Sequence, residues 1–171
     1  MQKREFLKLG AAGTLAVLTN SLRTSASFAD PNNIPAVDGE VYEVVKSDAE
    51  WKALLNEAEY AVLRHEATER AYTSPLNDEK RDGVFHCRGC DLPVYDSATK
   101  FDSGTGWPSF YEALPNAIRT KDDSSLLFTR TEVHCRRCGG HFGHIFEDGP
   151  KPTGIRHCIN GVSLKFVPKN A

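Results

Sequence analysis

The amino-acid sequence predicts a mainly β domain of the α+β class, with two small antiparallel sheets flanked by helices on the N-terminal side. Two observations support this prediction. Residues 48–68 carry apolar side chains at helical spacing, whereas from Gly83 onward short apolar runs alternate with polar residues and turn formers. The chain has 171 residues, which is enough for one domain with a hydrophobic core and few for two.

The helical segment begins at a recognisable cap. Ser47 stands before a first turn that contains Asp48 and Glu50, a pattern typical of a helix N-terminus. We expect a helix that continues or restarts through Ala61 to Thr68, with Trp51 in the core rather than at a functional site. The strands are expected at residues 84–86, 93–95, 126–128, 131–134, 145–146 and 162–167.

The first 29 residues have the order of an export signal. A basic start is followed by the apolar residues 9–18 and then by a polar stretch that ends in Ser27-Phe28-Ala29, where cleavage is expected. Lys3 and Arg4 resemble the paired arginines of a twin-arginine signal, with a lysine in place of the first arginine. The alternatives are a general secretory signal, a cytosolic arm and an uncleaved anchor at the lipid surface.

We therefore divide the chain into a signal at 1–29, a leader or linker at 30–46 and a folded domain at 47–171. The net charge of −2, the pI near 6.3 and the 40% hydrophobic content are typical of a soluble protein and give no broad basic face for nucleic acid. We expect an exported monomer in a bacterial periplasm, without stable membrane insertion after cleavage. If the signal is not functional, the protein is cytoplasmic.

Four of the five cysteines form two Cys-x-x-Cys pairs, Cys87 with Cys90 and Cys135 with Cys138. This spacing lets both thiolates of a pair bind one ion, so the two pairs predict a tetrahedral zinc site. Because protein ligands fill all four positions, the zinc is expected to be structural. The alternative is that these cysteines form disulfides, as in many exported proteins.

The fifth cysteine, Cys158, has no partner within the chain under this assignment. If its segment is extended, Arg156, Cys158 and Asn160 point to the same face. A guanidinium beside a thiol favours the reactive thiolate, and an amide can bind a polar atom of a substrate. The alternative is that Cys158 is a small buried apolar residue.

Two further groups of residues surround this candidate nucleophile in the sequence. His141 and His144 could transfer protons near neutral pH, with Asp148 to orient or charge one of the rings, or they could be core residues or metal ligands. Trp107 lies in a glycine-rich loop, where it could bind an apolar group of a substrate or only close the loop over the core.

Taken together, these motifs closely resemble those of the B-type methionine sulfoxide reductases, the peptide-methionine (R)-S-oxide reductases, over about residues 48 to 167. The matching motifs are the two Cys-x-x-Cys pairs, Phe101-Asp102-Ser103-Gly104, Gly106-Trp107-Pro108-Ser109-Phe110, His141-x-Gly143-His144-x-Phe146-x-Asp148-Gly149-Pro150, and Arg156-His157-Cys158-Ile159-Asn160. The resemblance implies a small antiparallel β domain that reduces methionine R-sulfoxide, mainly in oxidised proteins.

The resemblance also implies a role for each matching residue. Cys158 is the nucleophile that attacks the sulfoxide sulfur and becomes a sulfenic acid, and Arg156 stabilises its thiolate. At the remaining matching positions, His141, His144 and Asn160 bind and help protonate the sulfoxide oxygen. Asp148 supports the site, and Trp107 and Phe146 contact the substrate.

The chain departs from many family members at Thr105, where they carry a resolving cysteine. Since the other four cysteines are assigned to zinc, we expect a one-cysteine mechanism in which a thioredoxin-like protein or a small thiol reduces Cys158. Two rival functions stay open at this point. A zinc-dependent interaction module would not need Cys158, and a cysteine hydrolase would use Cys158 with His141 or His144 as its base.

Overall fold

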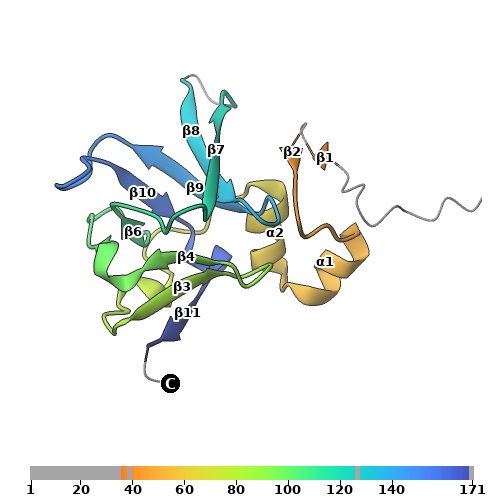
Figure 1. The fold of residues 1–171 in the computed structure, drawn as a ribbon, viewed down its shortest axis with the longest axis horizontal. Coiled ribbons are helices and arrows are strands. Elements are labelled where there is room, and N and C mark those ends of the chain that lie inside the picture. The colour runs from red at the N-terminus through yellow and green to blue at the C-terminus, as the bar shows by residue number, and fades with distance from the viewer. Residues whose placement is uncertain (1–35, 38–39, 126–127, 170–171) are drawn as a thin grey trace, which may run out of the picture. The chain divides into compact units, whose positions relative to one another are not determined.

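The computed structural model of the protein describes residues 36–37, 40–125 and 128–169 (Figure 1). The predicted export signal lies outside these residues. Within the segment predicted as a leader, strand β1 (Ala36–Val37) pairs with β2 (Glu40–Val41). Tyr42 is buried, and the Val44 N–H donates a hydrogen bond to the Arg137 carbonyl, so packing against the domain reaches back into this segment.

Two short helices follow, α1 (Asp48–Leu54) and α2 (Glu57–His65). Ser47 and Asn56 cap them, each in a capping box with the glutamate three residues later. The second cap explains why the helix restarts: the extended backbone at Leu55 and Asn56 is required for capping and is incompatible with a continuous helix. Neither helix in the described part of the chain is long and apolar enough to cross a membrane.

The remaining strands form two antiparallel sheets, which confirms the predicted fold class. One sheet has the order β5-β6-β10-β9-β8-β7, and the other has the order β11-β3-β4 (Figure 1). The bounds are β3 Gly83–Cys87, β4 Pro93–Asp96, β5 Lys100–Phe101, β6 Ser109–Phe110, β7 Ile118–Asp123, β8 Arg130–Cys135, β9 His141–Phe146, β10 Arg156–Ile159 and β11 Leu164–Pro168.

Two strand predictions were wrong in part. Phe128 lies in the connection between β7 and β8 with its side chain exposed, while residues 126–127 fall outside the described residues. The last strand begins at Leu164 rather than at residue 162, because Gly161–Ser163 form a 3-10 turn. In this turn the Ser163 hydroxyl donates to the Asn160 carbonyl, a local bond that competes with strand pairing.

Aromatic side chains join the two sheets in the core. Tyr95 of β4 stacks on Phe110 of β6 with ring centroids 4.3 Å apart, and Phe85 of β3 meets Phe110 edge to face at 5.0 Å. The Tyr95 hydroxyl lies 3.2 Å from Nδ1 of His157 in β10, and both side chains are buried. Burial lowers the pKa of His157 to about 4. The residue next to Cys158 is therefore a neutral core histidine.

We predict that His157 makes the fold sensitive to acid. Its folded-state pKa of about 4 lies below the unfolded value of about 6.5, so the unfolded chain binds the proton first and stability is lost as pH falls through this window. The loss between pH 7 and pH 5 is about 2 kcal/mol. Urea unfolding at both pH values should show a difference smaller by this amount in His157→Asn than in the wild type.

The exposed His65 provides the control, because His65→Asn should keep the wild-type pH dependence. Equal pH dependence in His157→Asn and the wild type would contradict a neutral buried His157.

Candidate active site and metal centre

The two Cys-x-x-Cys turns have the same backbone geometry. The first follows β3 and the second follows β8, and in each the N–H of the residue after the second cysteine donates to the carbonyl of the first cysteine. These bonds are Asp91 to Cys87 at 3.0 Å and Gly139 to Cys135 at 2.9 Å. Asp91 and Gly139 both have left-handed φ angles, of 63° and 68°. A glycine, the residue that adopts this conformation most easily, stands at this position in only one of the two turns.

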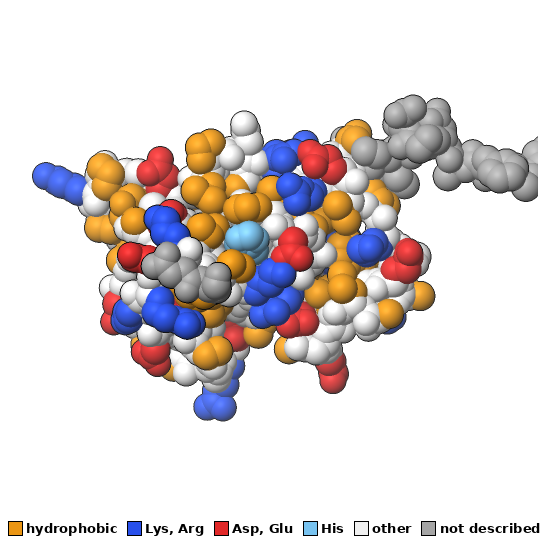
Figure 2. Space-filling view, turned by 60° about the horizontal axis from the view of Figure 1, so that its bottom comes forward, with side chains coloured by type: hydrophobic (Ala, Val, Ile, Leu, Met, Phe, Trp, Pro, Cys, Tyr) orange, Lys and Arg blue, Asp and Glu red, His pale blue; other side chains and the backbone are white. Residues whose placement is uncertain are grey.

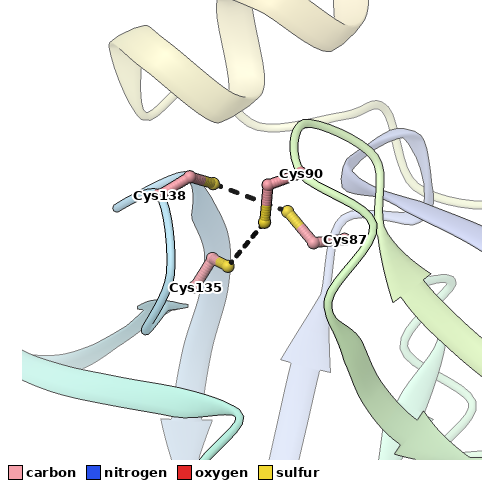
Figure 3. A group of neighbouring side chains, drawn as sticks. All are labelled: Cys87, Cys90, Cys135 and Cys138. Atoms are coloured by element: carbon pink, nitrogen blue, oxygen red, sulfur yellow. Dashed lines mark hydrogen bonds between the residues drawn. The ribbon is translucent and has the colours of Figure 1, made fainter. Parts of the chain in front are cut away.

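The four cysteine sulfurs form one cluster (Figure 3). All lie within 4.8 Å of one another, with Cys87 Sγ 3.7 Å from Cys138 Sγ and Cys90 Sγ 3.4 Å from Cys135 Sγ. Four thiolates around a tetrahedral zinc, each about 2.3 Å from the ion, are separated by roughly 3.8 Å. The cysteines are free rather than joined in disulfides, so the cluster can hold a metal ion with four protein ligands.

Helix α2 and Trp51 of α1 pack over this cluster. A Cβ at Gly140 would lie 2.8 Å from Leu63 Cδ2 and 3.4 Å from Cys138 Sγ, so Leu63 of α2 packs closely over the turn that carries Cys138. The Arg64 guanidinium donates to the Cys138 carbonyl at 3.1 Å. The N-terminal helices therefore cover the cysteine cluster.

Cys158 lies in β10, between β6 and β9, where it is paired with Ser109 and His144. Its side chain is half-buried and borders a mainly apolar cavity that also contains Trp107, Phe146, His144 and Asn160, as the sequence motifs predicted. Thr68, Arg130 and Gly143 complete the lining. Figure 2 shows one face of the domain, on which hydrophobic, basic and acidic side chains are interspersed.

Arg156 is fixed next to Cys158 by two neighbours. Its Nε and Nη2 atoms donate to the two carboxylate oxygens of Asp148 at 2.7 and 2.9 Å, and its guanidinium lies 4.4 Å from the Phe146 ring centroid. Burial raises the pKa of the Cys158 thiol, while the charge of Arg156 lowers it in part. The expected stabilisation of the thiolate by Arg156 is present, but burial outweighs it.

The two histidines come together through a bulge in β9. His141 and His144 differ in parity, so a regular strand would direct them to opposite faces. The register with β8 shifts by one residue at Phe142, and the two imidazole centroids consequently lie 5.5 Å apart. His144 borders the cavity beside Cys158, whereas His141 is buried behind it and does not line the cavity.

The carboxylates that bind these histidines were missed in the sequence. His144 Nε2 lies 2.8 Å from Asp123 Oδ2 of β7, and His141 Nδ1 lies 2.8 Å from Glu132 Oε1 of β8. The expectation that Asp148 orients a histidine was wrong, because its carboxylate is occupied by Arg156. Glu132 could have been found as an acidic residue inside a predicted strand, but nothing local distinguishes Asp123 from Asp122.

Asn160 and Trp107 are held by Glu69, which the sequence also did not reveal. The Glu69 N–H donates to Asn160 Oδ1 at 2.8 Å, and Trp107 Nε1 donates to the Glu69 carbonyl at 2.8 Å. The Asn160 amide nitrogen donates to the Phe142 carbonyl at 2.9 Å. Because one N–H of the Asn160 amide is donated to Phe142, the second N–H is the one that could donate to a substrate oxygen.

Thr105 lies at the other side of the thiol. Its Oγ1 is 4.0 Å from Cys158 Sγ and 2.8 Å from Ser103 Oγ, which is in turn 2.7 Å from the buried Ser109 Oγ. A chain of three hydroxyls therefore ends beside the sulfur.

Comparison with known proteins agrees with this site. The family model of the SelR domain matches residues 55–168. The chain belongs to the SelR-domain family of methionine sulfoxide reductases. It is 50% identical over 126 residues to the peptide methionine sulfoxide reductase MsrB of Thiobacillus denitrificans, covering 73% of this chain and 96% of that protein. It is 51% identical over 124 residues to the MsrB of Methanosarcina barkeri, covering 72% and 87%.

A plant relative aligns over a longer part of the chain. The chloroplastic peptide methionine sulfoxide reductase B1 of Arabidopsis thaliana is 43% identical over 153 residues, which is 89% of this chain and 75% of that protein. Among solved structures, the Mis18 "Yippee-like" domain matches with a TM-score of 0.42 at 20% identity, covering 53% of this chain and 100% of that chain. The sequence relatives confirm the resemblance found in the motifs, and the chain is a methionine sulfoxide reductase.

We predict that removing one cluster cysteine abolishes metal binding and destabilises the domain. Cys135→Ser should bind less than one metal ion per chain and unfold at least about 10 °C below the wild type, because the cluster joins the ends of β3 and β8. Metal analysis and thermal unfolding provide the two measurements. Cys158→Ser makes the same chemical change outside the cluster and should keep the metal, so equal losses in both variants would refute the assignment.

Proposed function

We propose that the protein reduces the R epimer of methionine sulfoxide, mainly in proteins, through Cys158 acting without a second cysteine. The observation that supports this most strongly is the position of Cys158 at a cavity that combines an apolar wall, Trp107 and Phe146, with polar groups of His144 and Asn160. A sulfoxide has the same combination, with a methyl group and an oxygen on one sulfur.

The proposed reaction transfers one oxygen atom from substrate to enzyme. The Cys158 thiol and the sulfoxide give methionine and a Cys158 sulfenic acid, so the substrate sulfur is reduced and the cysteine is oxidised by two electrons. An external thiol then displaces water from the sulfenic acid and forms a mixed disulfide. A second thiol releases Cys158 and leaves as the other half of a disulfide.

The side chains of the cavity supply the acid and the charge that this step needs. The Cys158 thiolate attacks sulfur, and the adjacent Arg156 stabilises the thiolate. His144 protonates the sulfoxide oxygen, because sulfur becomes a good electrophile only when its oxygen accepts a proton. Asn160 adds a hydrogen bond through its second N–H, and His141 supports His144 from behind.

The metal of the cysteine cluster is proposed to be zinc, one per chain, with Cys87, Cys90, Cys135 and Cys138 as ligands. The thiolate set and the sulfur separations support this identity. When bound, the zinc supplies structural stability and no open coordination position. The second turn ends two residues before His141, so the metal centre sets where β9 begins.

The reductant is proposed to be a thioredoxin-like protein or a small thiol. The absence of a cysteine at position 105 supports this, because Thr105 occupies the side of Cys158 where a resolving cysteine would act.

The order of basic, apolar and small residues in 1–29 supports export to a periplasm. We further propose that 47–171 is the catalytic domain and that the protein acts as a monomer.

The proposal is tested by offering both sulfoxide epimers of a blocked methionine to the purified protein with dithiothreitol. We expect turnover of the R epimer only, and a loss of at least about a thousandfold in Cys158→Ser because serine is a far weaker nucleophile. Turnover of the S epimer, or unchanged activity of the variant, would contradict the proposal. Burst release from an ester substrate would instead indicate a hydrolase.

Thr105→Cys should convert the protein to a two-cysteine mechanism. Its new sulfur would start about where Thr105 Oγ1 now lies, 4.0 Å from Cys158 Sγ, and small rotations could close this to the disulfide length of about 2.05 Å. After one turnover without reductant, peptide mapping should find a bond between residues 105 and 158. Thr105→Ser is the control without a new thiol, and a sulfenic acid that persists in Thr105→Cys would contradict the expectation.

A further inference from the structure

His144 belongs to a group of three side chains that come from three neighbouring strands. Asp123 ends β7, Arg130 begins β8, and His144 lies in β9. Asp123 Oδ2 accepts from Arg130 Nη2 at 2.6 Å and lies 2.8 Å from His144 Nε2. Both Arg130 and His144 border the cavity of Cys158, so the carboxylate of Asp123 lies directly behind the cavity wall.

The Asp123 carboxylate is held rigidly and stays ionised. Its second oxygen accepts from the Ser125 N–H at 2.9 Å. Hydrogen bonds from Ser125, together with those from His144 and Arg130, hold the pKa of Asp123 well below its usual range. The side chains of Asp123 and His144 are each 13% exposed, so solvent screens their interaction only in part.

An ionised carboxylate beside Nε2 determines which nitrogen of the imidazole carries the hydrogen in the neutral ring. Nε2 must carry a hydrogen to donate to Asp123, so in the neutral ring Nδ1 carries none. Nδ1 can give a proton to a substrate only when the ring is the imidazolium cation. Burial lowers the pKa of His144 below its usual value, and the hydrogen bond to Asp123 offsets this only in part.

We propose that Asp123 is a positioning residue for sulfoxide reduction, whose carboxylate fixes the orientation of His144 and favours the imidazolium form of its ring as the proton donor at the cavity. This inference rests on the proposed function. The corresponding pair of His141 and Glu132 lies outside the cavity lining, and Glu132 is also bound by Lys121 at 3.0 Å. Asp123 is thus the carboxylate that acts on the histidine beside Cys158.

The other groups near His144 are unchanged by a substitution at position 123, which makes the test specific. The charged and titratable groups that face His144 are Asp123 from β7, Arg130 and Glu132 from β8, His141 from β9 and Cys158 from β10. Asp123→Asn removes the charge and keeps one of the two acceptor oxygens, with an amide NH2 in place of the other. Asp122→Asn makes the same change on the adjacent, exposed residue and is the matched control.

The experiment measures kcat/KM for the R-sulfoxide with dithiothreitol from pH 5.5 to 9 in the wild type and both variants. In Asp123→Asn the fall in activity on the alkaline side should begin about one pH unit lower, so activity is about tenfold lower above that point. Asp122→Asn should keep the wild-type profile. Ring ¹⁵N chemical shifts should show the same downward displacement of the His144 titration, independently of turnover.

The rate of Cys158 alkylation by iodoacetamide should stay within about twofold of the wild type, since the variant acts on His144 rather than on the thiol. A uniform loss of activity without a displaced profile would show a merely structural residue and overturn the inference, as would equal effects of both variants. If the wild type reduces neither epimer, the proposed function fails, while the ¹⁵N titration still decides whether Asp123 controls His144.

Discussion

The convergence of four cysteine sulfurs is the constraint on which the rest of the domain depends. The sulfurs come from turns that follow β3 and β8, and these strands belong to different sheets. A metal ion bound by all four sulfurs would fix the separation and the relative orientation of the two strand ends, which a core of this size would otherwise determine by side-chain packing alone. The helices add Leu63, Trp51 and Arg64 around the same point.

The catalytic geometry follows from this constraint by short steps along β9. The strand starts three residues after Cys138, and the bulge at Phe142 turns His141 and His144 to one side. One residue later, a Cβ at Gly143 would lie 2.0 Å from the Cys158 carbonyl oxygen, so the backbones of β9 and β10 approach closely beside the nucleophile. Any displacement of β9 would therefore move both His144 and the Cys158 thiol.

The residues that could be predicted from the sequence are those whose role is indicated by their spacing or their number. Paired cysteines, an unpaired Cys158, and capped helices at Ser47 are local signals, and the structure brings Cys158, Trp107, His144 and Asn160 together. Contacts between side chains that only strand pairing or loop packing brings together could not be predicted in this way. Asp123 meets His144 only because β7, β8 and β9 are neighbours in one register, and Glu69 meets Trp107 across a loop.

The same limit explains the misplaced role of Asp148. It is close to both histidines in sequence, yet strand pairing of β9 with β10 brings Arg156 to it instead. Burial of Cys158 likewise depends on its neighbours in the sheet, so a sequence could show the adjacent guanidinium but not the opposing desolvation. The kind of chemistry could be predicted from the residue types, whereas the pKa values and orientations of these side chains depend on tertiary contacts.

A single turnover without reductant tests most directly whether Cys158 acts without a second cysteine of the chain. Reduced protein mixed with excess R-sulfoxide should release one methionine per chain and acquire one oxygen on the peptide that contains Cys158, in a form that dimedone traps. A disulfide from Cys158 to another cysteine of the same chain, or methionine release in Cys158→Ser, would contradict the account.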